Sequence, residues 1–403
     1  MQSLPYSVVF KIEAFLLLSR KAPVNSFEKS ELMPIRHTLE PSWKEIIADD
    51  PFSPIRMAWR VMSPPLSRWL GQPMAGPMHA TFIPTYECNL RCRPCGLRER
   101  IRMARMDGMQ KLSVTEVERV IDDLAAMRTG RFEIGGGEPL LCRDTLHYLR
   151  YARAKGLTTQ LSTNGLLLDE AMAEAIVETA VSTVEISVDG IDAKTHDRLK
   201  GRTGAFEGAL SALQYLSERK RGGKPELTAV SVFSEENLVQ LPHIAEKAMS
   251  CGADRYKILP KQRFHLPTGG GEMSVSFPRE LRQEGDRVLE ELMAIQKQRG
   301  VMDSSLAYLK LLKSYIRGEP LPVPCYAGYV TCVVDCYGQI FPCLGMLQQG
   351  RRVSNASEVS VRQHWHSASM AQTRQNLRDC RCCYWNCQTE PAFFHSFKVW
   401  AGR

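Results

Sequence analysis

The sequence predicts an α/β fold made of a partial (β/α)6 barrel followed by a small cysteine-rich domain. Three observations lead to this prediction. Short β-branched runs alternate with helical stretches between about residues 78 and 300, and three cysteines lie close together after the first of these runs. The last eighty residues hold eight of the 13 cysteines. Regular alternation of strands and helices is typical of a parallel sheet that is covered by helices.

The individual elements of the barrel can be assigned in order. Six apolar or β-branched runs are expected to be strands: 80–86, 131–134, 158–161, 183–188, 227–233 and 255–259. Five stretches have the periodicity of helices: 114–127, 169–179, 205–219, 238–250 and 278–299. Six strand–helix units suit an incomplete barrel, in which function collects on the loops at the C-terminal ends of the strands. We therefore expect the polar residues at these strand ends to line one cavity.

The loop after the first predicted strand carries Cys88, Cys92 and Cys95 at spacing C-x3-C-x2-C. Thiolates are soft ligands that bind zinc, copper(I) or iron–sulfur clusters. Three thiolates can hold one [4Fe–4S] cluster and leave its fourth iron open, which is what a catalytic metal centre needs. A zinc knuckle or a disulfide pair is the alternative, but a structural zinc site needs a fourth ligand nearby and none follows.

This loop resembles the signature loop of the radical S-adenosylmethionine (SAM) superfamily. In that superfamily the open iron binds the amino and carboxylate groups of SAM, and an electron from the cluster cleaves SAM to methionine and a 5′-deoxyadenosyl radical. The resemblance implies that Cys88, Cys92 and Cys95 hold the catalytic [4Fe–4S] cluster. The family often has an aromatic residue before the third cysteine, whereas this chain has Pro94.

A Gly-Gly-Gly-Glu-Pro segment at residues 135–139 follows the second predicted strand. Glycines let the backbone approach a ligand closely, and a carboxylate can accept a hydrogen bond from an ammonium group. The segment resembles the family's Gly-Gly-Glu-Pro motif. The resemblance implies that Gly136, Gly137 and Glu138 bind the amino group of SAM.

Two further strand ends carry polar residues that resemble SAM contacts of the family. Ser162 and Asn164 end the third strand, and Ser187 and Asp189 end the fourth. The resemblance implies that they contact the carboxylate and ribose of SAM, although Asp189 could instead cap a turn. Lys200 lies where a family segment carries a basic residue, usually arginine, that meets the SAM carboxylate.

Cysteines also bracket a predicted hairpin in the last part of the chain, with Cys325 before it, Gly338 at its turn and Cys343 after it. A hairpin brings its ends together, so both cysteines can face one metal. The pattern resembles the auxiliary-cluster domains of the SPASM and twitch subgroup. It implies one auxiliary [4Fe–4S] cluster, and a tetrahedral zinc site is the alternative. The implied ligands are Cys325, Cys343 and Cys383, with Cys380 or Cys387 as the fourth.

The chain is expected to have three parts: an extension at 1–77, the barrel at 78–300 and the auxiliary-cluster domain at 301–403. The extension contains an apolar segment at 7–18 and a mixed stretch at 54–62, which the following two prolines are expected to end. Neither shows a clean division into polar and apolar faces, which favours packing against the barrel or a partner subunit. Helices on a membrane surface are the alternative.

Composition restricts the compartment and the partners. With 44% hydrophobic and 24% charged residues the chain is typical of globular proteins. No secretory signal is evident, so we expect a cytoplasmic location, where clustered cysteines bind metal rather than form disulfides. The net charge of +8 is spread along the chain, and no nucleic-acid partner is expected.

The resemblance to the radical SAM superfamily implies an enzyme that abstracts hydrogen from a peptide or small-molecule substrate. The resemblance implies SAM and two [4Fe–4S] clusters as cofactors and an electron donor such as flavodoxin or ferredoxin. Action on a membrane lipid, with peripheral membrane contact, is one alternative. A non-catalytic iron–sulfur or zinc protein for electron transfer or scaffolding is the other, and the intact motif at 136–138 argues against it, because a carrier has no need to bind SAM.

Overall fold

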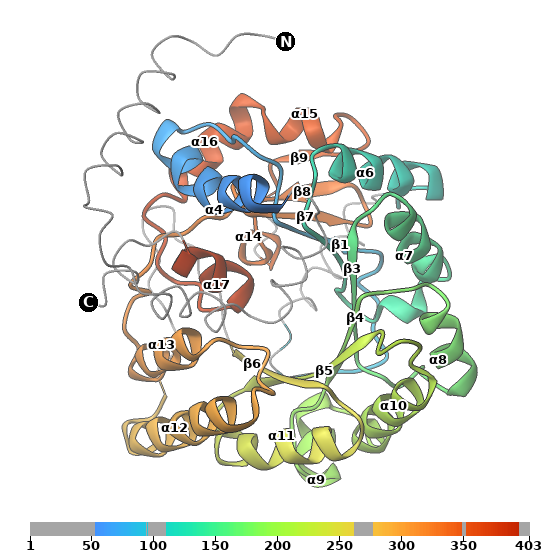
Figure 1. Cartoon of the computed structure of the whole chain (residues 1–403), viewed down its shortest axis with the longest axis vertical. Coiled ribbons are helices and arrows are strands. Elements are labelled where there is room, and N and C mark those ends of the chain that lie inside the picture. The colour runs from blue at the N-terminus through green and yellow to red at the C-terminus, as the bar shows by residue number, and fades with distance from the viewer. Residues whose placement is uncertain (1–52, 94, 96–109, 262–276, 349–351, 395–403) are drawn as a thin grey trace. The chain divides into compact units, whose positions relative to one another are not determined.

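The structure is a computed structural model, and it describes residues 53–93, 95, 110–261, 277–348 and 352–394 (Figure 1). The apolar segment predicted at 7–18 lies outside the described residues. Residues Leu39–Arg403 form one compact unit.

A single mostly parallel sheet organises this unit. Its nine strands run in the order β6-β5-β4-β3-β2-β1-β7-β8-β9, and neighbours from β6 to β1 pair in parallel. The six predicted strands are all present, and the predicted partial barrel is confirmed. They are β1 (His79–Ile83), β2 (Arg131–Ile134), β3 (Thr158–Thr163), β4 (Thr183–Ser187), β5 (Glu226–Phe233) and β6 (Arg255–Pro260).

Helices follow the strands and cover the outer side of the curved sheet (Figure 1). The five predicted helical stretches are confirmed, and the last two of them begin with a short 3-10 turn. The helices and turns of this part are α6 (Val114–Ala126), η1 (Pro139–Leu141), α7 (Thr145–Ala154), α8 (Glu170–Val177), α9 (Ala193–Lys200), α10 (Ala205–Arg219), η2 (Leu238–Gln240), α11 (Leu241–Ser250), η3 (Arg279–Leu281), α12 (Arg282–Arg299) and α13 (Leu306–Arg317).

The two faces of the strands differ in chemistry because successive side chains point to opposite sides of a sheet. In β1, Ala80 and Phe82 join the hydrophobic core, whereas His79 lines a cavity on the other side. In β2, Phe132 joins the core and Glu133 lines the cavity. At β1 and β2 the inner side of this half-barrel is therefore polar, unlike the branched apolar layers that usually fill closed barrels.

The cysteine-rich part of the chain extends the same sheet. The predicted hairpin is confirmed, and its first strand pairs in parallel with β1. Figure 1 shows α14 and α17 on the inner side of the sheet, opposite the outer helices. The division at residue 301 into two domains stays a prediction. The elements of this part are β7 (Thr331–Asp335), β8 (Gln339–Phe341), α14 (Leu344–Gln348), β9 (Ser354–Asn355), α15 (Val361–Trp365), α16 (Ala368–Asn376) and α17 (Asn386–Phe394).

The helix α4 (Ser53–Leu70) corrects one prediction. It continues through Pro64 and Pro65, which were expected to end it. Proline removes a backbone donor and usually interrupts a helix. The helical turns after the prolines are stabilised by a contact with the cysteine-rich part of the chain. Arg68 Nη1 donates a hydrogen bond to the carbonyl of Cys325 at 3.1 Å. Tertiary contacts thus keep a helix that the local sequence disfavours.

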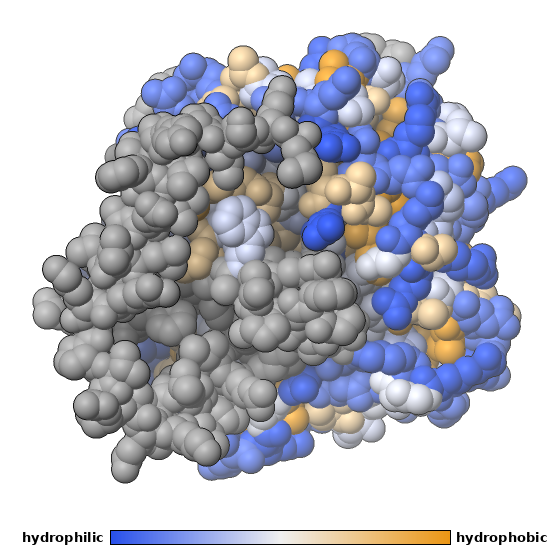
Figure 2. All heavy atoms as spheres, turned by 45° about the horizontal axis from the view of Figure 1, so that its top comes forward, coloured by the Kyte–Doolittle hydropathy of each residue, from blue (hydrophilic) through white to orange (hydrophobic). Residues whose placement is uncertain are grey.

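Among the described residues, no helix has the length and apolar character needed to cross a membrane. On the face in Figure 2, hydrophilic residues prevail over the described surface and hydrophobic residues are scattered between them.

Candidate functional site

One cavity of about 540 Å³ lies at the inner side of the sheet. It is lined by the cysteine loop, by the ends of several strands and by the cysteine-rich part of the chain. The expectation that the strand ends share one cavity is thereby met. Its lining includes Cys88, Cys92, Cys95, Gly136, Gly137, Ser162, Asn164, Ser187, Asp189, Lys200, Leu344, Trp385, Asn386 and Cys387.

The cysteine loop is held in place by the C-terminal end of α9. The amides of Arg91 and Arg93 donate to the carbonyls of Lys200 and Leu199, each at 3.0 Å. A Cβ atom on Gly201 would lie 2.6 Å from the carbonyl oxygen of Arg91, so only glycine allows this approach. Last-turn carbonyls, which lack partners within a helix, here bind the loop instead.

The loop is also tied to the end of β3. Asn164 Nδ2 donates to Asn89 Oδ1 at 2.7 Å, and the same nitrogen lies 3.9 Å from Cys88 Sγ. The amide of Leu90 donates to Cys88 Sγ at 3.4 Å. Such donors stabilise a thiolate, which is the form that binds metal.

The three loop cysteines share the cavity, as their spacing predicts. Desolvation raises the pKa of Cys92 to about 11, and the nearby Lys200 ammonium acts in the opposite direction. Within the part of the chain that the structure describes, no three His, Cys, Asp or Glu side chains are arranged as a metal site. The donor set nevertheless fits an iron–sulfur cluster, because metal binding itself deprotonates cysteines. Their assignment as ligands stays a prediction.

The glycine-rich turn packs against the start of the cysteine loop. A Cβ on Gly137 would lie 2.2 Å from the carbonyl oxygen of Glu87, and one on Gly136 would lie 2.4 Å from Ile83 Cγ2. Gly136 also has φ +117°, which side-chain-bearing residues rarely adopt. Both glycines line the cavity, where their backbone can face a ligand.

Glu138 is placed differently from its neighbours. It is completely buried and is not among the cavity-lining residues. Its carboxylate accepts hydrogen bonds from the Thr163 hydroxyl at 2.7 Å, from the amide of Asn164 at 2.9 Å and from the amide of Leu140 at 3.1 Å. It therefore joins the ends of β2 and β3, and the predicted contact of Glu138 with SAM stays untested.

The predicted contacts Ser162, Asn164, Ser187 and Asp189 all line the cavity. Asp189 does not merely cap a turn. Its carboxylate forms a buried ion pair with Lys200 at 2.8 Å and accepts a hydrogen bond from the amide of Val232 at 2.8 Å. The site therefore includes the buried ammonium of Lys200, a residue that the sequence analysis assigned to the site only by resemblance.

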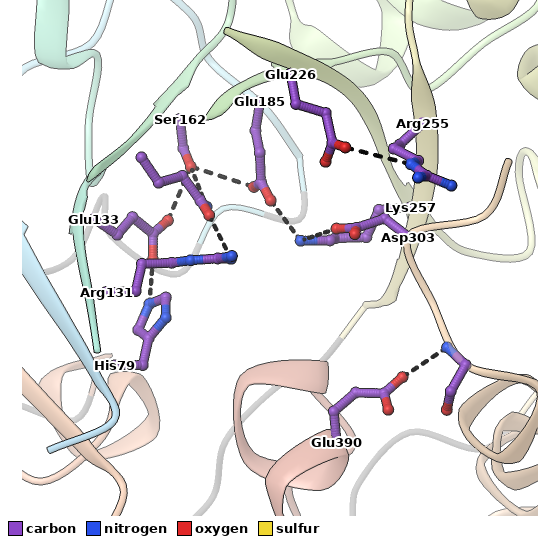
Figure 3. Close-up of polar contacts among 12 residues, drawn as sticks. His79, Arg131, Glu133, Ser162, Glu185, Glu226, Arg255, Lys257, Asp303 and Glu390 are labelled. Atoms are coloured by element: carbon purple, nitrogen blue, oxygen red, sulfur yellow. Dashed lines mark hydrogen bonds and ion pairs between the residues drawn. The ribbon is translucent and has the colours of Figure 1, made fainter. Parts of the chain in front are cut away.

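The sequence analysis missed a chain of polar side chains at the inner end of the cavity, which we call the inner polar network (Figure 3). His79 Nε2 lies 2.7 Å from Glu133, and the Ser162 hydroxyl donates to Glu133 at 2.8 Å and to Glu185 at 3.3 Å. Lys257 forms ion pairs with Glu185 at 2.5 Å and with Asp303 at 2.8 Å. The only sequence signal was their alternation with apolar residues in the strands. The network consists of His79, Glu133, Ser162, Glu185, Lys257 and Asp303.

Charge balance explains how these groups stay buried. Burial by itself would raise the pKa of Glu133, but the hydrogen bond and charge of His79, with help from Ser162 and Lys257, lower it to about 2. An ionised carboxylate is thus stabilised inside the protein, as buried charges require.

Six cysteines, rather than the five predicted, gather in the last part of the chain. The additional one is Cys382, whose Sγ lies 3.4 Å from that of Cys380. A hydrogen bond with Cys380 and burial raise the pKa of Cys325 well above its usual value. Cys380 contributes to a raised pKa of Cys343, and Cys343 contributes to a raised pKa of Cys383, so these thiols lie near one another. The hairpin therefore brings its two ends to the 380–387 run, as predicted, and Cys387 also lines the cavity.

Comparison with known proteins points to one family. Residues 82–248 match the family model described as Radical SAM superfamily. The AdoMet-dependent heme synthase of Methanosarcina barkeri is 27% identical over 312 residues, which cover 73% of this chain and 83% of that protein. The mycofactocin maturase MftC of Mycolicibacterium smegmatis is 27% identical over 313 residues, covering 76% and 75% of the two chains.

Among solved structures, Streptococcus suis SuiB bound to the precursor peptide SuiA is similar in fold. It aligns with a TM-score of 0.60 and 16% identity over 87% of this chain and 81% of that one.

Proposed function

The chain carries a radical SAM domain at residues 82–248 and is a radical SAM enzyme, and from this premise we propose that it modifies a peptide substrate with the help of an auxiliary iron–sulfur cluster. The observation that carries the proposal is the shared cavity. Cys88, Cys92 and Cys95 lie on its wall, and so do Trp385 and Cys387 of the cysteine-rich part.

The residues of the cavity have separable roles in this proposal. Cys88, Cys92 and Cys95 hold the catalytic [4Fe–4S] cluster, and the glycine turn and the strand ends orient SAM. When bound, these two groups supply the electron and the 5′-deoxyadenosyl radical that abstracts hydrogen. Trp385 and Pro260 also line the cavity, and the indole of Trp385 donates to the carbonyl of Pro260 at 3.1 Å.

The auxiliary cluster is proposed at the six-cysteine site. Cys325, Cys343 and Cys383 are the preferred ligands, with Cys380 or Cys387 as the fourth. A ligand at Cys387 would place this cluster at the border of the cavity, where it can accept an electron from a substrate radical or orient the substrate. Zinc at the same cysteines is the alternative that metal analysis excludes or confirms.

A peptide substrate is favoured by two observations. Five residues of the inner polar network line the cavity, and such polar surroundings suit a peptide better than a hydrocarbon chain. The similar proteins include a maturase and a structure bound to a precursor peptide. The heme synthase among the relatives favours a second candidate, an iron-porphyrin substrate. A cytoplasmic location, a flavodoxin or ferredoxin donor and peripheral membrane contact stay predictions.

The test is anaerobic reconstitution with iron and sulfide, iron counting and a dithionite-driven assay for 5′-deoxyadenosine. We expect about eight irons per chain, and about four with no 5′-deoxyadenosine in the Cys88→Ala/Cys92→Ala/Cys95→Ala variant. A peptide library and iron porphyrins, added separately, should then differ in how far they stimulate the reaction. A fully loaded wild type that makes no 5′-deoxyadenosine with either addition would contradict the proposal.

A further inference from the structure

We propose that Lys200 is a positioning residue that acts through the catalytic cluster, with its buried ammonium stabilising the cluster's reduced state and so making reduction easier. The inference rests on the proposed function, because it takes Cys88, Cys92 and Cys95 as the cluster ligands. It concerns the cluster itself in the absence of SAM and is therefore separate from any contact of Lys200 with the SAM carboxylate.

The position of Lys200 relative to the cysteine loop is fixed by the backbone. Its carbonyl accepts the amide of Arg91 at 3.0 Å, one residue before Cys92. Gly201, the next residue, packs directly on the Arg91 carbonyl. The backbone of Lys200 is therefore fixed against the cysteine loop.

The charge of Lys200 is retained in the interior. The residue is 5% exposed and lines the same cavity as the three cysteines. Its ammonium is held 2.8 Å from Asp189 Oδ2. Burial largely removes the screening by water and salt that weakens surface charges. His196 does not add a competing charge near pH 7, because burial and Lys200 lower its pKa to about 4.

Lys200 is tied to the loop through its own backbone, because its carbonyl accepts the Arg91 amide. Its ammonium and the three cysteines face the same cavity. Replacing Lys200 by a neutral residue leaves the Asp189 carboxylate in place, so the charge beside the loop becomes more negative by one.

Reduction adds one negative charge to the cluster. Net charge and solvent exposure are among the factors that set cluster potentials. Replacing Lys200 by methionine keeps a similar shape and removes the positive charge. We expect the ratio of reduced to oxidised cluster at a fixed applied potential to fall about tenfold in Lys200→Met, a shift of about 59 mV for one electron.

The experiment is a redox titration of the anaerobically reconstituted full chain without SAM, followed by electron paramagnetic resonance. The catalytic cluster's signal is the one that disappears in the triple cysteine variant. Lys200→Arg should restore the wild-type potential. Lys261→Met is the matched control, because Lys261 also lines the cavity but pairs with Glu235 at 3.6 Å. Asp189→Asn should shift the potential in the opposite direction to Lys200→Met.

Equal potentials in wild type and Lys200→Met would overturn the inference, and so would an equal shift in Lys261→Met. If Lys200→Met fails to load iron, Asp189→Asn decides the question, since an unchanged potential in that variant also overturns it. A wild type without any signal that depends on the three cysteines would instead refute the proposed function.

Discussion

The hydroxyl of Tyr86 donates a hydrogen bond to the carboxylate of Asp335 at 2.8 Å. Tyr86 lies two residues before Cys88, and Asp335 ends β7 in the cysteine-rich part of the chain. Both side chains are buried, and the ring of Tyr86 stacks on Tyr337 with centroids 6.1 Å apart. The start of the cysteine loop is thus linked to the hairpin by this hydrogen bond and by the pairing of β7 with β1.

Replacing Tyr86 by phenylalanine should destabilise this connection. The ring would stay in place, but the buried Asp335 carboxylate would lose the hydrogen bond from Tyr86, which costs about 1–3 kcal/mol. Urea unfolding should show this loss of unfolding free energy. Tyr151→Phe is the control, because its hydroxyl contacts the partly exposed Asp122 at 3.2 Å and should cost less. Equal losses in both variants would contradict the special role of the Tyr86–Asp335 bond.

The contact of Gly201 with the cysteine loop gives a prediction with a closely matched control. Gly201 and Gly204 both have positive φ, +66° and +80°, so alanine strains the backbone similarly at both. A Cβ at Gly201 would collide with Arg91, whereas a Cβ at Gly204 would meet no atom within 4 Å. We expect Gly201→Ala to lower 5′-deoxyadenosine formation at least tenfold and to reduce the iron content. Gly204→Ala should keep both 5′-deoxyadenosine formation and iron content close to wild type. Equal losses in the two variants would mean that the effect of Gly201→Ala does not come from its contact with the cysteine loop.

Local sequence patterns predicted the barrel correctly because its parallel strands follow one another along the chain. From β1 to β6, each strand pairs with the strand that precedes or follows it in the chain. The spacing of apolar residues in each segment indicates by itself whether that segment is a strand or a helix. The pairing of β7 with β1 joins residues about 250 apart and has no local signal. The continuation of α4 through Pro64 was missed for the same reason, because the contact of Arg68 with Cys325 lies far away in sequence.

The parts of the candidate site that belong to sequence motifs were predicted, and the parts that depend on tertiary packing were not. The cysteine loop, the glycine turn and the strand ends were placed on one cavity by their spacing. Glu133 and Glu185 were not, because inward-facing charges in strands look like ordinary alternation until their partners are known. Ser162 was assigned to SAM, yet its hydroxyl contacts these two carboxylates.

The number of thiols in the cysteine-rich part leads to a further prediction. A [4Fe–4S] cluster takes four ligands, and six cysteines gather at this site. We expect Cys343→Ala to lose about four irons per chain after reconstitution, and Cys382→Ala to keep about eight. Cys332→Ala is the control, since Cys332 is buried in the main core. Loss of iron in Cys382→Ala with retention in Cys343→Ala would mean that the assigned ligand set is wrong.

The inner polar network should make stability depend on acid pH through Glu133. Its pKa is lowered from 4.5 to about 2 in the folded protein, so folding favours its ionised form. The resulting stabilisation is complete above about pH 4.5 and is lost as the pH falls toward 2. A shift of this size corresponds to about 3 kcal/mol.

Glu133→Gln keeps the shape and a hydrogen-bonding oxygen but removes the charge that His79 and Lys257 stabilise. We expect the variant to be about 3 kcal/mol less stable than wild type at pH 7. The difference should shrink as the pH falls from 5 to 3, because wild type then loses the contribution that the variant lacks. Urea unfolding at several pH values measures this. Glu290→Gln, with an exposed carboxylate on α12 that pairs with Lys313, is the surface control and should follow wild type. Wild type and Glu133→Gln curves that stay parallel from pH 7 to 3 would show that Glu133 is not held ionised by its neighbours.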